Sequence, residues 1–224
     1  MSAHRDDPTA FDPRGHAAGA GKKPGMSTVQ GHRSAVDKAA DKRDAIMSAA
    51  LALFVERGFH GTAVPEVAER AGVGAGTIYR YFESKEALVN ELYRRHKQLL
   101  ATRVLAQFPV DAVAREQFRA LWFRMARYVA DEPLGFAFLE LHNHRSYLDA
   151  ESRAAEERLK QFAVQFLEAA QRRGEIRAVA PMILIGVVMG AFIGLVRHAG
   201  ECGLVMDEAA WTTAEQCVWE AIRS

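Results

Sequence analysis

The chain has 224 residues, of which 49% are hydrophobic and 25% charged, a composition typical of a soluble globular protein. Its 29 Lys and Arg residues nearly balance 28 Asp and Glu residues, so a uniformly basic nucleic-acid-binding surface is excluded. Two cysteines, Cys202 and Cys217, are too few for a disulfide framework or a four-ligand zinc site. No secretory signal is visible at the N-terminus. We therefore expect a reduced, cytoplasmic protein with neither metal nor cofactor.

The first 38 residues differ in composition from the rest of the chain. They hold three of the seven prolines and five of the seventeen glycines, with almost no large apolar side chains. Such a segment buries too little surface to offset the entropy lost on ordering. We predict that residues 1–38 form a disordered extension.

From residue 39 onward the apolar residues recur with the period of an α-helix. Between Asp41 and Arg57, for example, Ile46, Ala49 and Leu53 share one helical face, and Gly58 follows as a left-handed cap. Asp207 is a plausible N-cap for the last helix. Further helices are predicted over Ala112–Asp131, Leu134–Leu148, Ser152–Arg173 and Met182–Val196. Because no segment alternates with period two, the sequence predicts an all-α fold.

An uncharged stretch from Ala178 to Val196 allows two interpretations, a membrane span or a buried helix. Pro181 limits the helix to Met182–Val196, about 22 Å at ~1.5 Å per residue, against a hydrocarbon core of ~30 Å. We therefore favour a fully buried helix and expect no membrane partner. Glycines recur there every fourth residue, so a second helix can approach closely. We predict a four-helix homodimer interface formed by this helix and the last one, through Gly186, Gly190, Gly194, Trp211, Val218 and Ile222.

Residues 61–85 have the pattern of two short helices joined by a tight turn. Thr62 is a good N-cap for the first helix. Gly72 supplies the turn, and Ile78 and Phe82 face inward on the second helix at i and i+4. This pattern predicts a helix-turn-helix.

The outward side of the second helix suits DNA. Its first turn consists of small residues, so the backbone can approach a partner, and Tyr79, Arg80 and Tyr81 follow. Lys85 opens the next helix, where its charge and the free N–H groups favour a phosphate. A helix entering the major groove between phosphate contacts needs this distribution.

The same residues resemble those of the tetracycline-repressor (TetR/AcrR) family of one-component regulators. The resemblance covers roughly residues 38 to 95 and rests on Thr62, Val67, Ala68, Ala71, Gly72, Val73, Gly76, Thr77, Tyr79, Tyr81, Phe82, Ser84, Lys85 and Leu88. It implies a dimeric all-α repressor with a DNA-binding head and a ligand-binding bundle, which we place at residues 39–99 and 100–224. It also implies DNA contacts by Thr62, Ala75, Gly76, Thr77, Tyr79, Arg80, Tyr81 and Lys85.

The bundle region carries large apolar side chains that suit a flat, mostly apolar effector. The candidates for the ligand pocket are Phe118, Trp122, Met125, Phe136, Phe162 and Phe166, which would also serve as ordinary core. No nucleophile or metalloprotease motif occurs, so we do not expect an enzyme. The sequence favours a repressor that an apolar effector releases from inverted-repeat DNA. The alternative is a helix-turn-helix DNA-binding or scaffold protein without small-molecule input.

Overall fold

The structure, a computed structural model, describes residues 35–140, 144 and 146–224 of the chain. Within these ranges the chain is all-α, as the sequence predicts, and its only β pairing is an isolated antiparallel bridge between Ile176 and Arg223. The helices are α1 (Ala35–Arg57), α2 (Val64–Arg70), α3 (Ala75–Ile78), α4 (Lys85–Leu105), α5 (Ala114–Asp131), α6 (Pro133–Glu140), α7 (Ala150–Arg172), α8 (Pro181–Cys202) and α9 (Glu208–Ile222).

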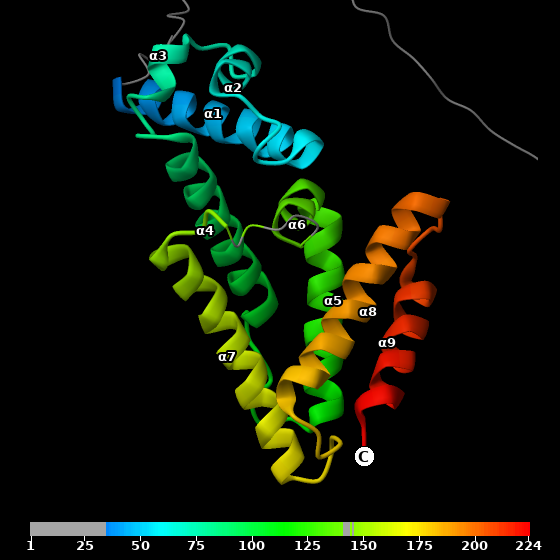
Figure 1. The fold of residues 1–224 in the computed structure, drawn as a ribbon. Coiled ribbons are helices and arrows are strands. Elements are labelled where there is room, and N and C mark those ends of the chain that lie inside the picture. The colour runs from blue at the N-terminus through cyan, green and yellow to red at the C-terminus, as the bar shows by residue number, and fades with distance from the viewer. Residues whose placement is uncertain (1–34, 141–143, 145) are drawn as a thin grey trace, which may run out of the picture.

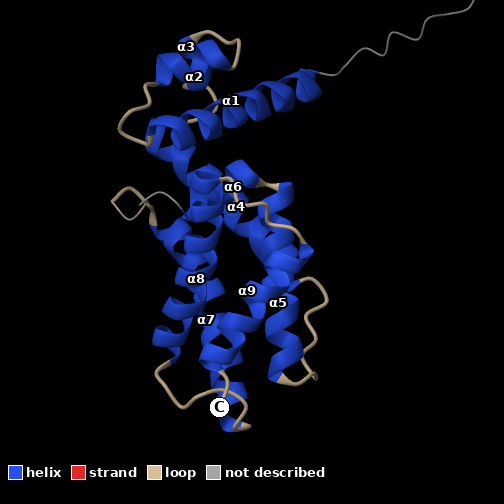
Figure 2. Ribbon diagram, turned by 90° about the vertical axis from the view of Figure 1, so that its right-hand side faces the viewer, coloured by secondary structure: helices blue, strands red, loops and turns tan. Residues whose placement is uncertain are grey.

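The helices form a small head and a longer bundle (Figure 1). Helices α1, α2 and α3 make the head, and α4 leads from it into the bundle of α5 to α9. The side view shows the same division, with α6 next to the head (Figure 2). A recognition surface on α3 therefore lies at one end of the molecule, and the bundle lies beyond α4.

Two hydrophobic cores correspond to the two parts. The core of the head includes Phe54, Ile78 and Phe82, together with Phe138 of α6. The core of the bundle is built around Trp122, with aromatic side chains from several helices. The Leu100 side chain of α4 packs against both cores. Helices α4 and α6 therefore join the head to the bundle.

Several helices have capping residues at their ends, and those at Gly58 and Asp207 follow the sequence prediction. Gly58 and Gly174 end α1 and α7 with φ of +71°, the left-handed conformation that glycine adopts without strain. At the start of α9, the Asp207 carboxylate accepts a hydrogen bond from the Ala210 N–H at 2.8 Å. Ser84 caps α4 in the same way, through a hydrogen bond of 3.1 Å from the Ala87 N–H.

Two predicted boundaries were wrong. Helix α1 begins at Ala35, so residues 35–38 belong to it, while residues 1–34 of the predicted extension lie outside the described part. The helix expected over 134–148 ends at Glu140. Tyr147 lies in a turn, where its carbonyl accepts a hydrogen bond of 2.8 Å from the buried Asn90 amide of α4. This hydrogen bond from a side chain takes the place of the backbone hydrogen bond that the Tyr147 carbonyl would accept in a helix.

Helix α8 is not fully buried, which contradicts the expectation of a fully buried helix. It is the one helix of the described part that is long and apolar enough to cross a membrane, yet only 17% of its most apolar stretch is buried. Leu184 and Phe192 face the core, whereas Ile183 and Val187 are 57% and 44% exposed. One side of α8 therefore presents apolar side chains that no part of the described chain covers.

Candidate DNA-binding head and ligand cavity

Helices α2 and α3 form the expected helix-turn-helix. Gly72 takes a φ of +66° in the turn, and the Val73 N–H donates a hydrogen bond of 3.0 Å to the Ala68 carbonyl. Ile78 and Phe82 are 2% and 3% exposed, and they fix the inner side of α3 and the turn after it. The opposite side of α3 is left facing outward.

The outer side of α3 and of the turn that follows it presents most of the residues predicted for DNA. Tyr79 is 57% exposed, and Arg80 is exposed beside it. Ala75 and Gly76 are exposed in the first turn, where a Cβ on Gly76 would meet no atom within 4 Å. Thr77 is partly buried. The short, small-residue helix thus leaves space for a partner at its first turn.

Tyr81 is partly buried and packs against the core of the head. Because part of its ring is held by that core, Tyr81 has a structural role in addition to the predicted DNA contact.

Thr62 does not face the outer surface, and its predicted role is corrected. It is 1% exposed, and its hydroxyl donates hydrogen bonds to the carbonyls of Gly58 and Leu53, at 2.9 and 3.2 Å. The N-cap of α2 is Ala63, whose N–H donates to Glu66 at 2.9 Å. Thr62 therefore holds the loop after α1 and is not available to DNA.

Lys85 also turns toward the protein. Its ammonium donates hydrogen bonds to the carbonyl oxygens of Phe59 and Thr62, at 2.8 and 3.0 Å. It lies 4.2 Å from the centroid of the Phe59 ring, within the range of a cation–π contact. In this conformation Lys85 joins the start of α4 to the loop before α2, in place of the phosphate contact expected from sequence.

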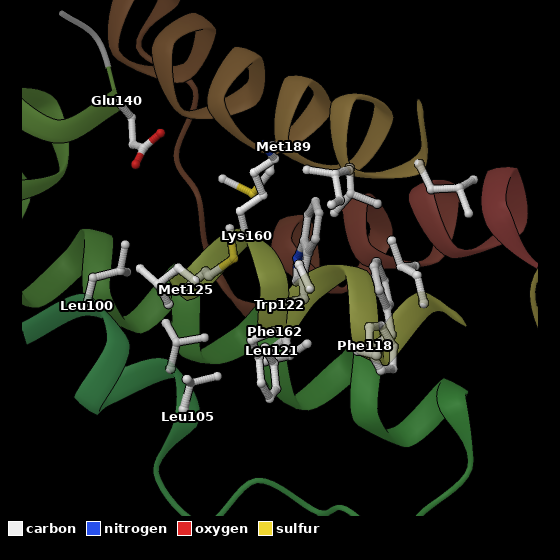
Figure 3. Close-up of a pocket in the computed structure, with 18 of the residues that line it drawn as sticks. Leu100, Leu105, Phe118, Leu121, Trp122, Met125, Glu140, Lys160, Phe162 and Met189 are labelled. Carbon is white, nitrogen blue, oxygen red and sulfur yellow. The ribbon is translucent and has the colours of Figure 1, made fainter. Parts of the chain in front are cut away.

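The bundle forms a partly open cavity of about 320 Å³ with mainly apolar walls. Figure 3 shows Glu140 at one end and Phe118 at the other, with Trp122 and Met125 between them. The structure brings all six predicted pocket residues to this cavity: Phe118, Trp122, Met125, Phe136, Phe162 and Phe166. The helical spacing of the predicted residues in α5 and α7 therefore identifies side chains that line one common surface, and Phe136 of α6 lines it too.

Sequence reasoning missed the polar part of the cavity. Lys97, Glu140, Glu156 and Lys160 line it, as does Tyr128. Lys97 and Glu140 form an ion pair of 3.0 Å, and their side chains are only 11% and 16% exposed. A search for apolar periodicity does not detect these residues, because they are charged. They come from α4, α6 and α7, which only the tertiary fold brings to one cavity.

The predicted dimer residues fall into two groups. Gly186 and Gly190 are exposed on α8 and Gly194 is partly buried, and a Cβ added at any of the three meets no atom within 4 Å. By contrast, Val218 and Ile222 are 8% and 1% exposed within the core of the bundle.

Trp211 packs against the same core, stacked on Phe192 with 5.3 Å between ring centroids. The prediction is therefore wrong for Val218 and Ile222, which are buried in the core of their own protomer, whereas Trp211 is only partly buried and stays a predicted dimer contact.

Comparison with known proteins supports the same two-part organisation. Residues 46–92 match the family of bacterial regulatory proteins of the tetR family, and residues 93–224 match the tetracyclin repressor-like C-terminal domain. The HTH-type transcriptional repressor KstR2 of Mycolicibacterium smegmatis is 31% identical over 98 residues, which are 40% of this chain and 48% of that protein. The fatty acid metabolism regulator protein of Bacillus subtilis is 33% identical over 72 residues, 32% of this chain and 37% of that protein.

The chain thus spans about half the length, or less, of these curated relatives. A crystal structure of a TetR family transcription regulator from Marinobacter aquaeolei VT8 has the same fold, with a TM-score of 0.74 at 22% identity. That likeness covers 84% of this chain and 99% of the other. The two family matches together extend from the first core residues of the head to the last residue of the sequence. The chain belongs to the tetR family of bacterial regulatory proteins.

Proposed function

We propose that this protein is a dimeric transcriptional repressor that leaves an inverted-repeat DNA site when a small, mostly apolar effector enters the bundle. The observation that carries this proposal is the combination of an exposed α3 on the head and an apolar cavity in the bundle, joined by α4. Membership of a family of regulators supports a role in DNA binding instead of catalysis.

On the DNA side, the proposed contacts come from the outer surface of α3 and of the turn that follows it. Tyr79 and Arg80 supply a phenol and a guanidinium, which bind phosphates or base edges. Ala75 and Gly76 let the helix approach the major groove, and Thr77 lies beside them. A twofold dimer presents two such helices, so the matching site is an inverted repeat.

On the effector side, the walls of the cavity favour an apolar ligand. Aromatic and Met side chains give large contact area at low entropic cost. A cavity of about 320 Å³ lies at the lower end of the range of small-molecule sites, roughly 300–1,000 Å³. The effector releases DNA only if it binds the non-DNA-binding state more tightly, since equal affinity for both states shifts nothing.

The exposed face of α8 supports the dimer. Ile183 and Val187 form an apolar patch together with Gly186 and Gly190, where a partner helix can approach closely. We propose that a second copy of the chain covers this patch, so that the protein is a soluble cytoplasmic dimer in which α8 crosses no membrane.

Two arginine substitutions test the DNA assignment. Arg80→Ala removes an exposed charge from the turn after α3, and Arg172→Ala removes an exposed charge at the far end of α7 (Figure 1). Fluorescence anisotropy with DNA from upstream of the protein's own gene is expected to show about tenfold weaker binding for Arg80→Ala, and also for Tyr79→Ala. Arg172→Ala is the matched control and should bind like the wild type. Equal affinity of all four proteins would overturn the assignment of α3.

A further inference from the structure

Two buried polar atoms lack a hydrogen-bond partner in the described part of the chain, and both lie at the same place. They are the Tyr128 hydroxyl of α5 and Nδ1 of His96 in α4. Tyr128 is 1% exposed and His96 is 7% exposed. A buried polar group without a hydrogen-bond partner destabilises the fold, so the coincidence of two such atoms requires an explanation.

Both atoms converge on Gly135, in the first turn of α6. A Cβ added at Gly135 would lie 2.5 Å from His96 Nδ1 and 3.0 Å from the Tyr128 hydroxyl. Any side chain at residue 135 would therefore clash with these two buried atoms, and glycine lets α6 pack directly against them. Tyr128 is also part of the cavity wall, as are Phe136 of α6 and Lys97 of α4. Tyr128 thus belongs to the cavity wall near α6, and His96, which does not line the cavity, lies beside it at Gly135.

The groups in and beside this part of the cavity wall favour an uncharged ligand. Burial lowers the pKa of the His96 imidazole, and burial raises the pKa of the Tyr128 phenol. Both side chains are therefore neutral at neutral pH, and each can donate or accept a hydrogen bond. Lys97 is already paired with Glu140, so an incoming carboxylate would have to displace Glu140 from its cation.

Glu156 and Lys160 also line the cavity, and Lys160 is paired with Glu157 at 3.2 Å. The rest of the wall offers few polar atoms to a ligand. The indole N–H of Trp122, the largest aromatic residue of the wall, already donates to the Trp211 carbonyl at 3.2 Å. A ligand in the cavity is therefore held by apolar contacts along Phe118, Met125 and Phe162, and its polar group is directed to the Tyr128 end.

We propose that the effector is a neutral amphipathic molecule whose ring or chain packs among the aromatic and Met side chains and whose single hydroxyl or carbonyl oxygen hydrogen-bonds to Tyr128. This inference rests on the proposed function, in which the cavity holds the effector. It adds the chemical class of that effector and Tyr128 as the residue that selects it. The oxygen would bind against α6, whose Phe138 packs into the core of the head.

Three probes of similar size separate the possibilities: 2-naphthol, 2-methylnaphthalene and 2-naphthoate. They carry a neutral hydroxyl, no polar group and a carboxylate, respectively. Isothermal titration calorimetry on the wild-type full chain at neutral pH is expected to show 2-naphthol binding about tenfold more tightly than 2-methylnaphthalene, and 2-naphthoate binding most weakly. This comparison needs no variant, so it remains valid if a variant fails to fold.

Tyr128→Phe then tests the residue itself. It is expected to abolish the preference for 2-naphthol while keeping the affinity for 2-methylnaphthalene. The matched control is Tyr147→Phe, which removes a tyrosine hydroxyl that bonds His144 outside the cavity, at 2.7 Å. This control should keep the preference.

Each of the other possible results would overturn the role of Tyr128, the neutral character of the effector or the proposed effector cavity. If 2-methylnaphthalene binds but the hydroxyl gives no advantage, or the advantage survives in Tyr128→Phe, the inference about Tyr128 fails and the proposed cavity function stands. If 2-naphthoate bound most tightly, the effector would be anionic and the proposal of a neutral effector would be wrong. If none of the probes binds the wild-type protein, both the inference and the proposed effector cavity fail.

Discussion

The Lys85 ammonium lies 2.8 Å from the carbonyl oxygen of Phe59 and 4.2 Å from the centroid of the same residue's ring. One side chain at the start of α4 thus holds both the backbone and the side chain of the loop that follows α1. The third contact, to the Thr62 carbonyl at 3.0 Å, extends this hold to the residue before the α2 cap.

Lys85→Met is therefore expected to destabilise the head. Loss of a charged donor to two backbone carbonyls should lower the free energy of unfolding by about 1–3 kcal/mol. Urea denaturation followed by circular dichroism measures this change. Arg80→Ala, at an exposed residue of the turn after α3, is the control and should change DNA affinity without changing stability. If Lys85→Met weakens DNA binding with the unfolding midpoint unchanged, the role of Lys85 is a phosphate contact.

The ion pair between Arg115 and Glu215 joins α5 to α9 and predicts an asymmetric response to mutation. The guanidinium contacts both carboxylate oxygens, one of them at 2.8 Å, and the Glu215 side chain is 0% exposed while that of Arg115 is 31% exposed. Arg115→Met leaves a buried carboxylate unpaired and is expected to cost about 3–5 kcal/mol of unfolding free energy.

Glu215→Met should cost less, because water can reach the arginine that remains. The double variant should recover much of the loss, since it leaves no buried charge. Chemical denaturation of the four proteins gives the coupling energy directly. Equal costs for the two single variants would contradict this account of the pair.

His96 predicts a dependence of stability on pH. Burial lowers the pKa of His96 from the ordinary 6.5, with the Glu132 carboxylate opposing the shift. As the pH falls below the unfolded value, the unfolded chain takes up a proton that the folded chain does not, so stability is lost on acidification.

His96→Gln should therefore lose less unfolding free energy than the wild type between about pH 7 and about pH 5. Thermal unfolding at both pH values checks this difference. His198→Gln, at an exposed histidine of α8, is the control and should keep the pH dependence of the wild type. An unchanged dependence in His96→Gln would show that other groups cause it.

Gly190 tests the proposed dimer without disturbing the protomer. A Cβ there meets no atom within 4 Å, so Gly190→Phe fits the isolated chain. In a dimer formed through the α8 face, the added ring would separate the two helices. Sedimentation velocity should show a shift from dimer to monomer, with unchanged helical content. Ala154→Phe, at an exposed residue of α7, is the control and should remain dimeric. A wild-type monomer at micromolar concentration would overturn the dimer itself.

Periodicity predicted the inner sides of the helices, because burial repeats with the helix turn. It placed Ile78 and Phe82 inside the head, and it collected Phe118 and Trp122 on one surface that proves to be a cavity wall. Periodicity identifies the apolar side of a helix but not the element that covers it. This is why Val218 and Ile222, correctly recognised as apolar, were assigned to a partner chain when they pack within their own protomer.

The remaining errors concern polar side chains whose partners are distant in sequence. Thr62 has the residue type of an N-cap, yet its hydroxyl bonds the Leu53 carbonyl in α1, and Glu66 caps α2 from the other side. The Tyr128 hydroxyl is buried without a hydrogen-bond partner because Gly135 of α6 packs closely against it. Local sequence holds no information on such contacts until the tertiary arrangement is known.

Helix α4 contains neither glycine nor proline between Lys85 and Leu105, so it has no built-in hinge. Its 21 residues span about 30 Å, with cavity-lining Leu100 near one end and Lys85 at the other. A rod of this length converts a tilt of about 5° at the cavity into a displacement of about 3 Å at the head. Half-sites on DNA lie a fixed ~34 Å apart, so a displacement of this size in each subunit is a substantial mismatch. In the proposed function, an unbroken α4 would therefore turn a small movement at the cavity into a larger displacement of the recognition helix, without a large rearrangement of the bundle.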